Sequence, residues 1–161
     1  IMEVFRGSTI VIKQPLVAAG RKRLDFGQGF YVTDIRQQAE SWAERMQRIR
    51  EEVGVVNVYE LDYEKIKEHY RYYKFDYYDN AWLQFIIANR MGQNDVEKYD
   101  VIEGGVANDR VIDTVEAYMA NMMTLETALR ELSRHKPNNQ LCITNQKIVD
   151  TCMGYIESYN I

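Results

Sequence analysis

The residues most able to do chemistry in this chain lie between Asp25 and Thr33. Two glycines, Gly27 and Gly29, precede the aromatic run Phe30-Tyr31-Val32-Thr33, which reads as a short strand. A glycine at the start of that strand indicates a positive φ or a backbone that another group approaches closely. An aromatic ring after such a turn can present a flat face to a planar ligand. The same pattern also fits a turn that leads into an ordinary buried strand.

A second candidate is Arg6, which is followed by Gly7 and Ser8. Residues 2–6 alternate weakly between apolar and polar side chains, so we expect a strand that stops at this Gly-Ser turn. An arginine at the end of an inner strand can hold a phosphate or a ribose. It can equally form an ion pair with one of the 24 acidic residues, and the pattern fits both interpretations.

Other kinds of site are not indicated. Cys142 and Cys152 have no metal-type spacing and form no disulfide framework, and His69 and His135 have no ligand-like neighbours. No structural metal is therefore expected. With no apolar run long enough to span a membrane and no visible signal peptide, we expect a protein of the reducing cytoplasm.

Composition sets the size of the domain and limits its partners. With 161 residues, 46% hydrophobic and 27% charged, residues 1–161 are expected to form a single globular domain. The formal net charge of -4 argues against a protein built mainly to hold a nucleic-acid backbone. The basic run 21–23 is interpreted as a solvated loop. The aromatic and basic segment 70–78 could stack on single-stranded nucleic acid, but we favour a strand with half-buried tyrosines.

The elements that must position these residues follow from hydrophobic spacing. Asp34 and Gln37 predict a capping box for a helix that ends near Gly54, with Trp42 in the core. Further strands are expected at 55–61, 70–78, 99–103, 140–144 and 153–159, and further helices at 63–69, 80–91, 110–119, 125–132 and 145–151. Because strands and helices mix without regular βαβ alternation, we expect an α+β fold with a largely antiparallel sheet.

Three pieces line up along the chain. They are a strand ending Arg6-Gly7-Ser8, a strand starting Gly29-Phe30-Tyr31 and a strand starting Asn139-Gln140. This order resembles the ADP-ribosyltransferase superfamily, on the branch shared by diphtheria-type toxins and poly(ADP-ribose) polymerases. Those enzymes have a His-Gly-Ser/Thr strand end, a Gly-x-Gly-Ile/Phe-Tyr-Phe motif and a late strand that bears a glutamate.

More closely, the whole chain is similar to an uncharacterised bacterial family of that superfamily. Its members share an Asp-Phe-Gly-x-Gly-Phe-Tyr-x-Thr motif, a Gln-Ala-x-x-Trp-Ala helix and a Val-Ala-x-Asp segment. Here these motifs are Asp25 to Thr33, Gln38 to Ala43 and Val106 to Asp109. Their joint match in one order is more specific than any single motif.

The resemblance implies an α+β, ADP-ribosyltransferase-like fold in which two small, mainly antiparallel sheets frame a cleft for NAD. It implies that the Gly7 backbone holds the nicotinamide amide and that Arg6, in place of the family's histidine, meets ribose or phosphate. Ser8 would hydrogen-bond the nicotinamide or its ribose, and Tyr31 would stack on the nicotinamide ring. The implied NAD-binding set is Arg6, Gly7, Ser8, Gly29, Phe30, Tyr31 and Asp109, and the implied catalytic set is Arg6, Tyr31 and Gln140.

Gln140 falls at the position of the family's catalytic glutamate. Breaking the nicotinamide–ribose bond passes through an oxocarbenium-like transition state, as glycoside hydrolysis does. A neutral amide keeps the hydrogen bond that a carboxylate would make, but it supplies no charge and cannot act as a general base. Losing one such contact costs on the order of 3 kcal/mol, about a hundredfold in rate. Transfer is therefore expected to be slow, confined to a reactive acceptor, helped by Asp109 or Glu103, or absent.

Two classes of function follow from the resemblance. The first is an NAD-dependent mono-ADP-ribosyltransferase that uses NAD as its substrate and modifies an acceptor that the sequence does not identify. The second is a catalytically silent module that binds NAD or ADP-ribose and acts through partners. Some bacterial relatives are toxins encoded beside small neutralising proteins, so an antitoxin-like partner is expected by analogy alone.

Overall fold

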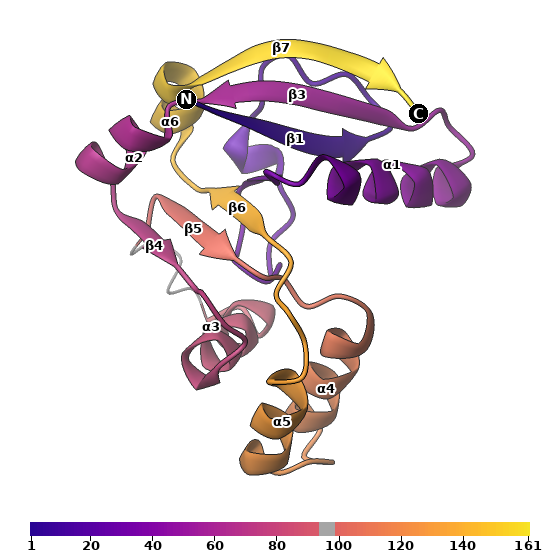
Figure 1. The fold of residues 1–161 in the computed structure, drawn as a ribbon, viewed down its shortest axis with the longest axis vertical. Helices are drawn as coiled ribbons and strands as arrows, with labels where there is room; N and C mark the ends of the chain where they lie inside the picture. Colours follow the sequence, from indigo (N-terminus) through magenta and orange to yellow (C-terminus); the bar gives the residue numbers. More distant parts are fainter. Residues whose placement is uncertain (94–98) are drawn as a thin grey trace.

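Two small sheets and six α-helices make up the described part of the chain (Figure 1). The computed structural model describes residues 1–93 and 99–161, without the side chain of Asp109. The first sheet is antiparallel, in the order β1 (Met2–Ser8), β3 (Val55–Leu61), β7 (Met153–Asn160). The second sheet has the order β2 (Phe30–Val32), β6 (Gln140–Ile143), β5 (Val101–Gly104), β4 (Tyr72–Lys74). Its β4–β5 pair is parallel and its other pairs are antiparallel, which confirms the predicted α+β class.

Two of the three predicted side-chain caps form at the helix starts. The helices are α1 (Arg36–Arg50), α2 (Tyr63–His69), α3 (Asn80–Arg90), α4 (Asp109–Met119), α5 (Leu125–Leu132) and α6 (Gln146–Cys152), with a 3-10 turn, η1 (Val17–Ala19), after β1. Asp79 and Thr124 accept hydrogen bonds from the backbone N–H groups of Trp82 and Thr127, so they cap α3 and α5 as predicted. None of the described helices is both long and apolar enough to cross a membrane.

The second sheet lies between two apolar layers (Figure 1). Its one face packs toward the first sheet, where Phe30 and Leu141 meet Tyr59. Its other face packs on α3, α4 and α5, where Ile102 and Cys142 meet a second core cluster. Because side chains alternate along a strand, neighbouring residues of β2 and β6 enter different layers. Tyr31 therefore lies on the helix side of the sheet, whereas Phe30 lies between the two sheets.

Helix α1 lies unusually close to β1 because small residues line their contact. Ala39 and Ala43 are the buried residues of α1. A Cβ atom on Gly7 would lie 2.2 Å from the Ala39 carbonyl oxygen and 2.9 Å from the Ala43 nitrogen. Gly7 therefore has a packing role in addition to any role of its backbone in a site.

We predict that Gly7→Ala lowers the free energy of unfolding by about 3 kcal/mol or more, because the new methyl group would meet a helix backbone that has to move. Gly154→Ala in β7 is the matched control, since a Cβ there meets nothing within 4 Å. Urea denaturation of both variants gives the comparison. Equal loss of stability in the two variants would refute the close packing of α1 on β1.

Two predictions about α1 are wrong. Trp42 is 47% exposed rather than buried, because the alanines hold the helix axis near the sheet and leave the Trp42 side of α1 facing outward under Arg45. The capping box does not form, since the N-cap residue is Ile35 and no side chain caps it. Asp34 instead accepts a 2.9 Å hydrogen bond from Asn139.

The aromatic strand expected at 70–78 is shorter than its composition suggests. Only Tyr72–Lys74 pairs with β5. After the Phe75 N–H bonds to the Glu103 carbonyl, the chain leaves the sheet toward α3. Tyr77 is 71% exposed and Tyr78 is buried, so the tyrosines do not continue the strand alternation.

Candidate functional site

Strands β1 and β2 meet at one point and then separate. Phe5 and Thr33 form an isolated antiparallel bridge, with N–H···O distances of 2.8 and 2.9 Å. Because backbone groups alternate in direction along a strand, the N–H and C=O of Gly7 project from the same edge of β1 as those of Phe5. Continuing the register of the bridge sets Gly7 opposite Tyr31. No hydrogen bond joins Gly7 to β2 among the described residues, so these two backbones border a gap.

The Arg6 side chain reaches from β1 to β2. Its Nη1 donates to the Tyr31 carbonyl oxygen at 3.0 Å, and its guanidinium lies 4.8 Å from the centre of the Phe30 ring. Burial lowers the pKa of Arg6. Its buried Nε has no hydrogen-bond partner, and Arg6 forms no ion pair, among the side chains that the structure describes. The sequence allowed Arg6 either to hold a phosphate or ribose or to form an internal ion pair, and no such ion pair is found among the described side chains.

Tyr31 is held by the motif that precedes it. Its hydroxyl donates to the Gly27 carbonyl at 2.6 Å and accepts from the Phe26 N–H at 3.0 Å. Its ring is nearly parallel to that of Phe26, at 10° and 6.5 Å between centres. Burial raises the pKa of Tyr31 well above its usual value. The hydroxyl is therefore not available as an acid or base, and the ring is the part of Tyr31 that can serve a ligand.

The two glycines of the motif have different tasks. Gly27 has a φ of 84°, which lets the turn wrap around the Tyr31 hydroxyl. Gly29 has no positive φ, but a Cβ there would lie 2.5 Å from the Cys142 sulfur and 2.7 Å from the Ile143 carbonyl oxygen. The group that approaches Gly29 closely is therefore strand β6.

Gln140 lies on the same face of the second sheet as Tyr31. Tyr31 pairs with Cys142, and Gln140 is two residues before Cys142 on β6. Such diagonal neighbours lie about 7–8 Å apart. The half-buried Gln140 amide forms no side-chain hydrogen bond with any described residue. The structure thus brings Arg6, Tyr31 and Gln140 to one region and leaves the Gln140 amide free for a ligand.

Asn139 fixes the start of β6 and hence the position of Gln140. Its carbonyl oxygen accepts from Thr33 Oγ1 at 2.7 Å and from Gln38 Nε2 at 3.1 Å. Its Nδ2 donates to Asp34 at 2.9 Å and to Glu103 at 2.8 Å. The glutamine of the Gln38 to Ala43 motif therefore supports the strand end that carries Gln140.

Glu103 lies on the other face of the second sheet from Gln140. It precedes Gly104, the residue that pairs with Gln140, so its side chain points the opposite way. Its Oε1 accepts hydrogen bonds of 2.5 Å from the hydroxyls of Tyr63 and Tyr72. Burial, together with the bond to Glu103, raises the pKa of Tyr63 to about 12. Glu103 is therefore committed to this network and does not supply the charge that Gln140 lacks.

A buried carboxylate joins the first motif to the third. Asp25 binds Arg90 at 2.6 Å and accepts from the Ala107 N–H at 2.6 Å. Its carbonyl oxygen accepts from Asn89 at 2.9 Å. Burial raises the pKa of Asp25, and the Arg90 charge opposes that rise. Sequence reasoning missed Asn89 and Arg90, because the helical pattern gives no sign that the end of α3 faces Asp25.

The other predicted site residues lie as follows. Ser8 is buried, and its Oγ accepts from the Ile10 N–H at 3.3 Å. Phe30 packs edge-on to Tyr59 in the core between the sheets and reaches the site only through its contact with Arg6. The side chain of Asp109 lies outside the described residues, so its predicted role is not addressed by the structure.

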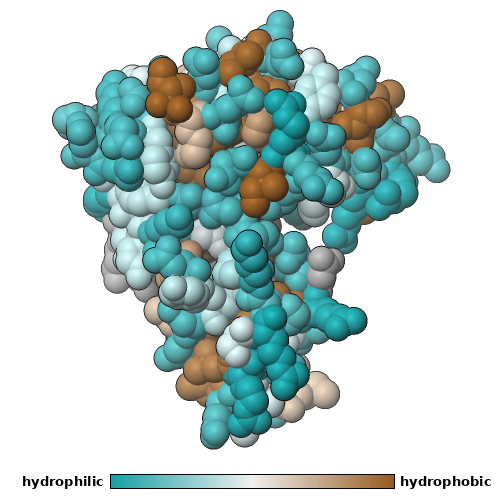
Figure 2. Space-filling model, in the orientation of Figure 1, coloured by the Kyte–Doolittle hydropathy of each residue, from teal (hydrophilic) through white to brown (hydrophobic). Residues whose placement is uncertain are grey.

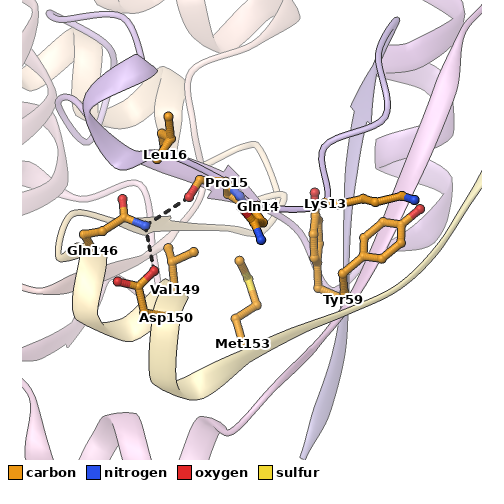
Figure 3. Close-up of a pocket in the computed structure, with 10 residues that line it drawn as sticks. Lys13, Gln14, Pro15, Leu16, Tyr59, Gln146, Val149, Asp150 and Met153 are labelled. Atoms are coloured by element: carbon orange, nitrogen blue, oxygen red, sulfur yellow. Dashed lines mark hydrogen bonds between the residues drawn. The ribbon is translucent and has the colours of Figure 1, made fainter.

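The space-filling view shows a notch in the surface below α1 (Figure 2). A separate cavity of about 380 Å³ lies between the loop before η1 and α6, and Arg6, Tyr31 and Gln140 do not line it (Figure 3).

Comparison with known proteins places the chain in one family. No curated protein and no solved structure gives a significant match. A family model described as "Protein of unknown function (DUF3990)" matches residues 2–155, nearly the whole length. The chain therefore belongs to the DUF3990 family.

Proposed function

We propose that this protein binds NAD at the gap between β1 and β2 and transfers its ADP-ribose unit to an acceptor. The observation that carries the proposal is Arg6, a partly buried cation whose buried Nε has no hydrogen-bond partner and whose charge has no anionic partner among the described side chains. A buried charge is costly unless a ligand or side chain compensates it. The diphosphate of NAD is an anion that would do so.

The groups around Arg6 suit the rest of NAD. The free N–H and C=O of Gly7 match the acceptor and donor of a carboxamide, as in nicotinamide. The Tyr31 ring, fixed by Phe26 and Gly27, offers a flat surface for the nicotinamide ring. The free amide of Gln140 is suited to hold a ribose hydroxyl.

The reaction would break the bond between the nicotinamide nitrogen and the ribose. The bonding electrons leave with nicotinamide, and positive charge develops at the anomeric carbon. A nucleophilic group of the acceptor then bonds to that carbon and loses its proton to a base. Gln140 would orient the ribose without stabilising the positive charge, so the acceptor or another acidic residue has to stabilise that charge.

The neutral Gln140 favours a second candidate function. The described carboxylates of this region already have structural roles. Glu103 lies on the opposite face of the sheet and binds Tyr63, and Asp25 binds Arg90. Neither replaces the glutamate that ADP-ribosyltransferases carry at the position of Gln140. A site of this kind can bind NAD or ADP-ribose without cleaving it. The protein would then act as a nucleotide-binding interaction module.

One experiment separates these functions. Calorimetry measures NAD binding by the purified protein, and nicotinamide release is followed with and without cell lysate. A transferase binds NAD and releases nicotinamide faster when lysate supplies an acceptor. A binding module binds NAD and releases none. A protein that neither binds NAD nor releases nicotinamide contradicts both functions.

Two substitutions of Tyr31 test the stacking role. Tyr31→Ala is expected to weaken NAD binding about tenfold or more, because a stacked base contributes about 1–3 kcal/mol. Tyr31→Phe should keep NAD affinity but lower stability by about 1–3 kcal/mol, since it leaves the Phe26 N–H and Gly27 C=O unpaired. Calorimetry and thermal unfolding measure the two effects. Unchanged NAD affinity in a folded Tyr31→Ala protein would remove Tyr31 from the site.

A further inference from the structure

The cavity beside α6 is built from four segments of the chain. The loop before η1, β3, α6 and β7 all contribute to it, and its volume is about 380 Å³ (Figure 3). That volume falls within the range of about 300–1,000 Å³ found for small-molecule sites. Its walls include the buried side chains of Pro15, Tyr59 and Val149. The cavity thus combines apolar walls with polar side chains and is large enough for a small ligand.

The loop that forms one wall is pinned in place. Asn57 accepts from the Ile12 N–H at 2.9 Å and donates to the Ile10 carbonyl at 3.0 Å. The Tyr59 hydroxyl donates to the Ile12 carbonyl at 2.6 Å. The Gln146 amide holds the loop to α6, through the Pro15 carbonyl at 3.0 Å and the Val17 N–H at 2.9 Å. A cavity with walls fixed in this way needs little ordering when it binds a ligand.

The positively and negatively charged side chains of the cavity lie at opposite ends of it. Lys13 forms no ion pair with a described residue, and its ammonium lies 6.0 Å from the centre of the Tyr155 ring. Asp150 lies at the Gln146 end, where one of its oxygens accepts a hydrogen bond from Gln146 at 3.0 Å and the other accepts none from a described residue. Figure 3 shows Lys13 extending away from Asp150, with Met153 between them. A ligand that uses both ends therefore needs an acidic group and a donor that are far apart.

We propose that this cavity binds a nucleoside monophosphate whose base carries an amino group, with the phosphate at Lys13 and the amino group at Asp150. The flat base suits the apolar walls at Tyr59 and Val149. The separation of the charged groups excludes an α-amino acid, in which the ammonium and the carboxylate sit on one carbon. The proposal does not rest on NAD binding, since Arg6, Tyr31 and Gln140 do not line the cavity.

Calorimetry with adenosine monophosphate as the probe tests this site. The nucleotide should bind at least about tenfold more tightly than adenosine or inorganic phosphate alone. Lys13→Met should weaken its binding about tenfold, whereas Lys147→Met should not. Lys147 is the control because it is an exposed lysine on α6 outside the cavity lining. Equal effects of the two lysine variants would overturn the proposal.

Two further measurements complete the test. Inosine monophosphate should bind about tenfold more weakly, because its carbonyl oxygen would face Asp150, and Asp150→Asn should abolish that difference. Equal binding of the two nucleotides by the unmodified protein would overturn the assignment of Asp150. Arg6→Met should leave adenosine monophosphate binding unchanged. Loss of that binding in a folded Arg6→Met protein would place the nucleotide at the NAD gap and refute the cavity as its site.

Discussion

Replacing Arg6 with methionine is expected to weaken NAD binding about 30-fold or more without lowering the stability of the free protein. Methionine fills similar space and removes a partly buried cation that has no anionic partner among the described side chains. Removing that cation favours the folded state, and the lost hydrogen bond to Tyr31 offsets about 1 kcal/mol of the gain. A residue that costs stability in the free protein and is needed for a ligand is typical of a functional site.

Arg90 provides the matched control for Arg6, because it is an arginine of similar setting that does have a partner. Its guanidinium lies 2.6 Å from the buried Asp25 carboxylate. Arg90→Met should therefore lower the free energy of unfolding by about 3 kcal/mol, since Asp25 would stay buried and unpaired. Denaturation and NAD calorimetry on both variants make the comparison. If Arg6→Met destabilises as much as Arg90→Met and leaves NAD affinity unchanged, Arg6 is a structural residue.

The strands that carry the site could be predicted from local sequence. Weak alternation identified β1, near-continuous apolar content identified β3, and glycine marked the start of β2. Capping residues Asp79 and Thr124 identified two helix starts. These signals are local, because each depends on residues within a few positions of one another. The order of the strands within each sheet did not follow from them.

What could not be predicted depends on contacts between distant segments. The network around Asn139 joins residues 33–38, 63, 72 and 103, and no sequence spacing indicates that they meet. Asp34 lies where the sequence predicts a helix cap, but its carboxylate accepts a hydrogen bond from Asn139 instead of from the helix backbone. Trp42 has the periodicity of a core residue, but its exposure is decided by how closely Ala39 and Ala43 let α1 approach Gly7. In each case tertiary contact overrides the local pattern.

Some motif residues have structural roles that could not be predicted from their residue types. The glycine pattern predicted a positive φ at Gly29 or a group that approaches its backbone closely, and the approaching group is β6. Asp25 was noticed as part of a motif, but its bonds to Arg90 and Ala107 show that it joins that motif to the segment before α4. The register of β2 against β6 sets Tyr31 and Gln140 on one face of the sheet. The motif residues therefore build the support of the site, and only some of them can touch a ligand.

Gln140→Glu is expected to raise NAD cleavage by about one to two powers of ten. The Gln140 side chain forms no hydrogen bond with a described residue, so a carboxylate can replace the amide without breaking a structural contact. It would stand on the Tyr31 face of β6, where the ribose of bound NAD would develop positive charge. Gln140→Met, which keeps the length of the side chain but neither hydrogen-bonds nor carries charge, should cleave NAD no faster than the unmodified protein.

Nicotinamide release by these variants and by Asp109→Asn, each checked for folding by circular dichroism, identifies the group that supplies the charge. If Gln140→Glu accelerates release, the position needs a carboxylate and the unmodified protein is a weakened transferase. If Gln140→Glu slows release and Asp109→Asn abolishes it, Asp109 already supplies the charge and a second carboxylate interferes with it. If no variant releases nicotinamide although all bind NAD, the gap between β1 and β2 is a nucleotide-binding site without catalysis, because even a restored carboxylate would then find no ribose in position to react.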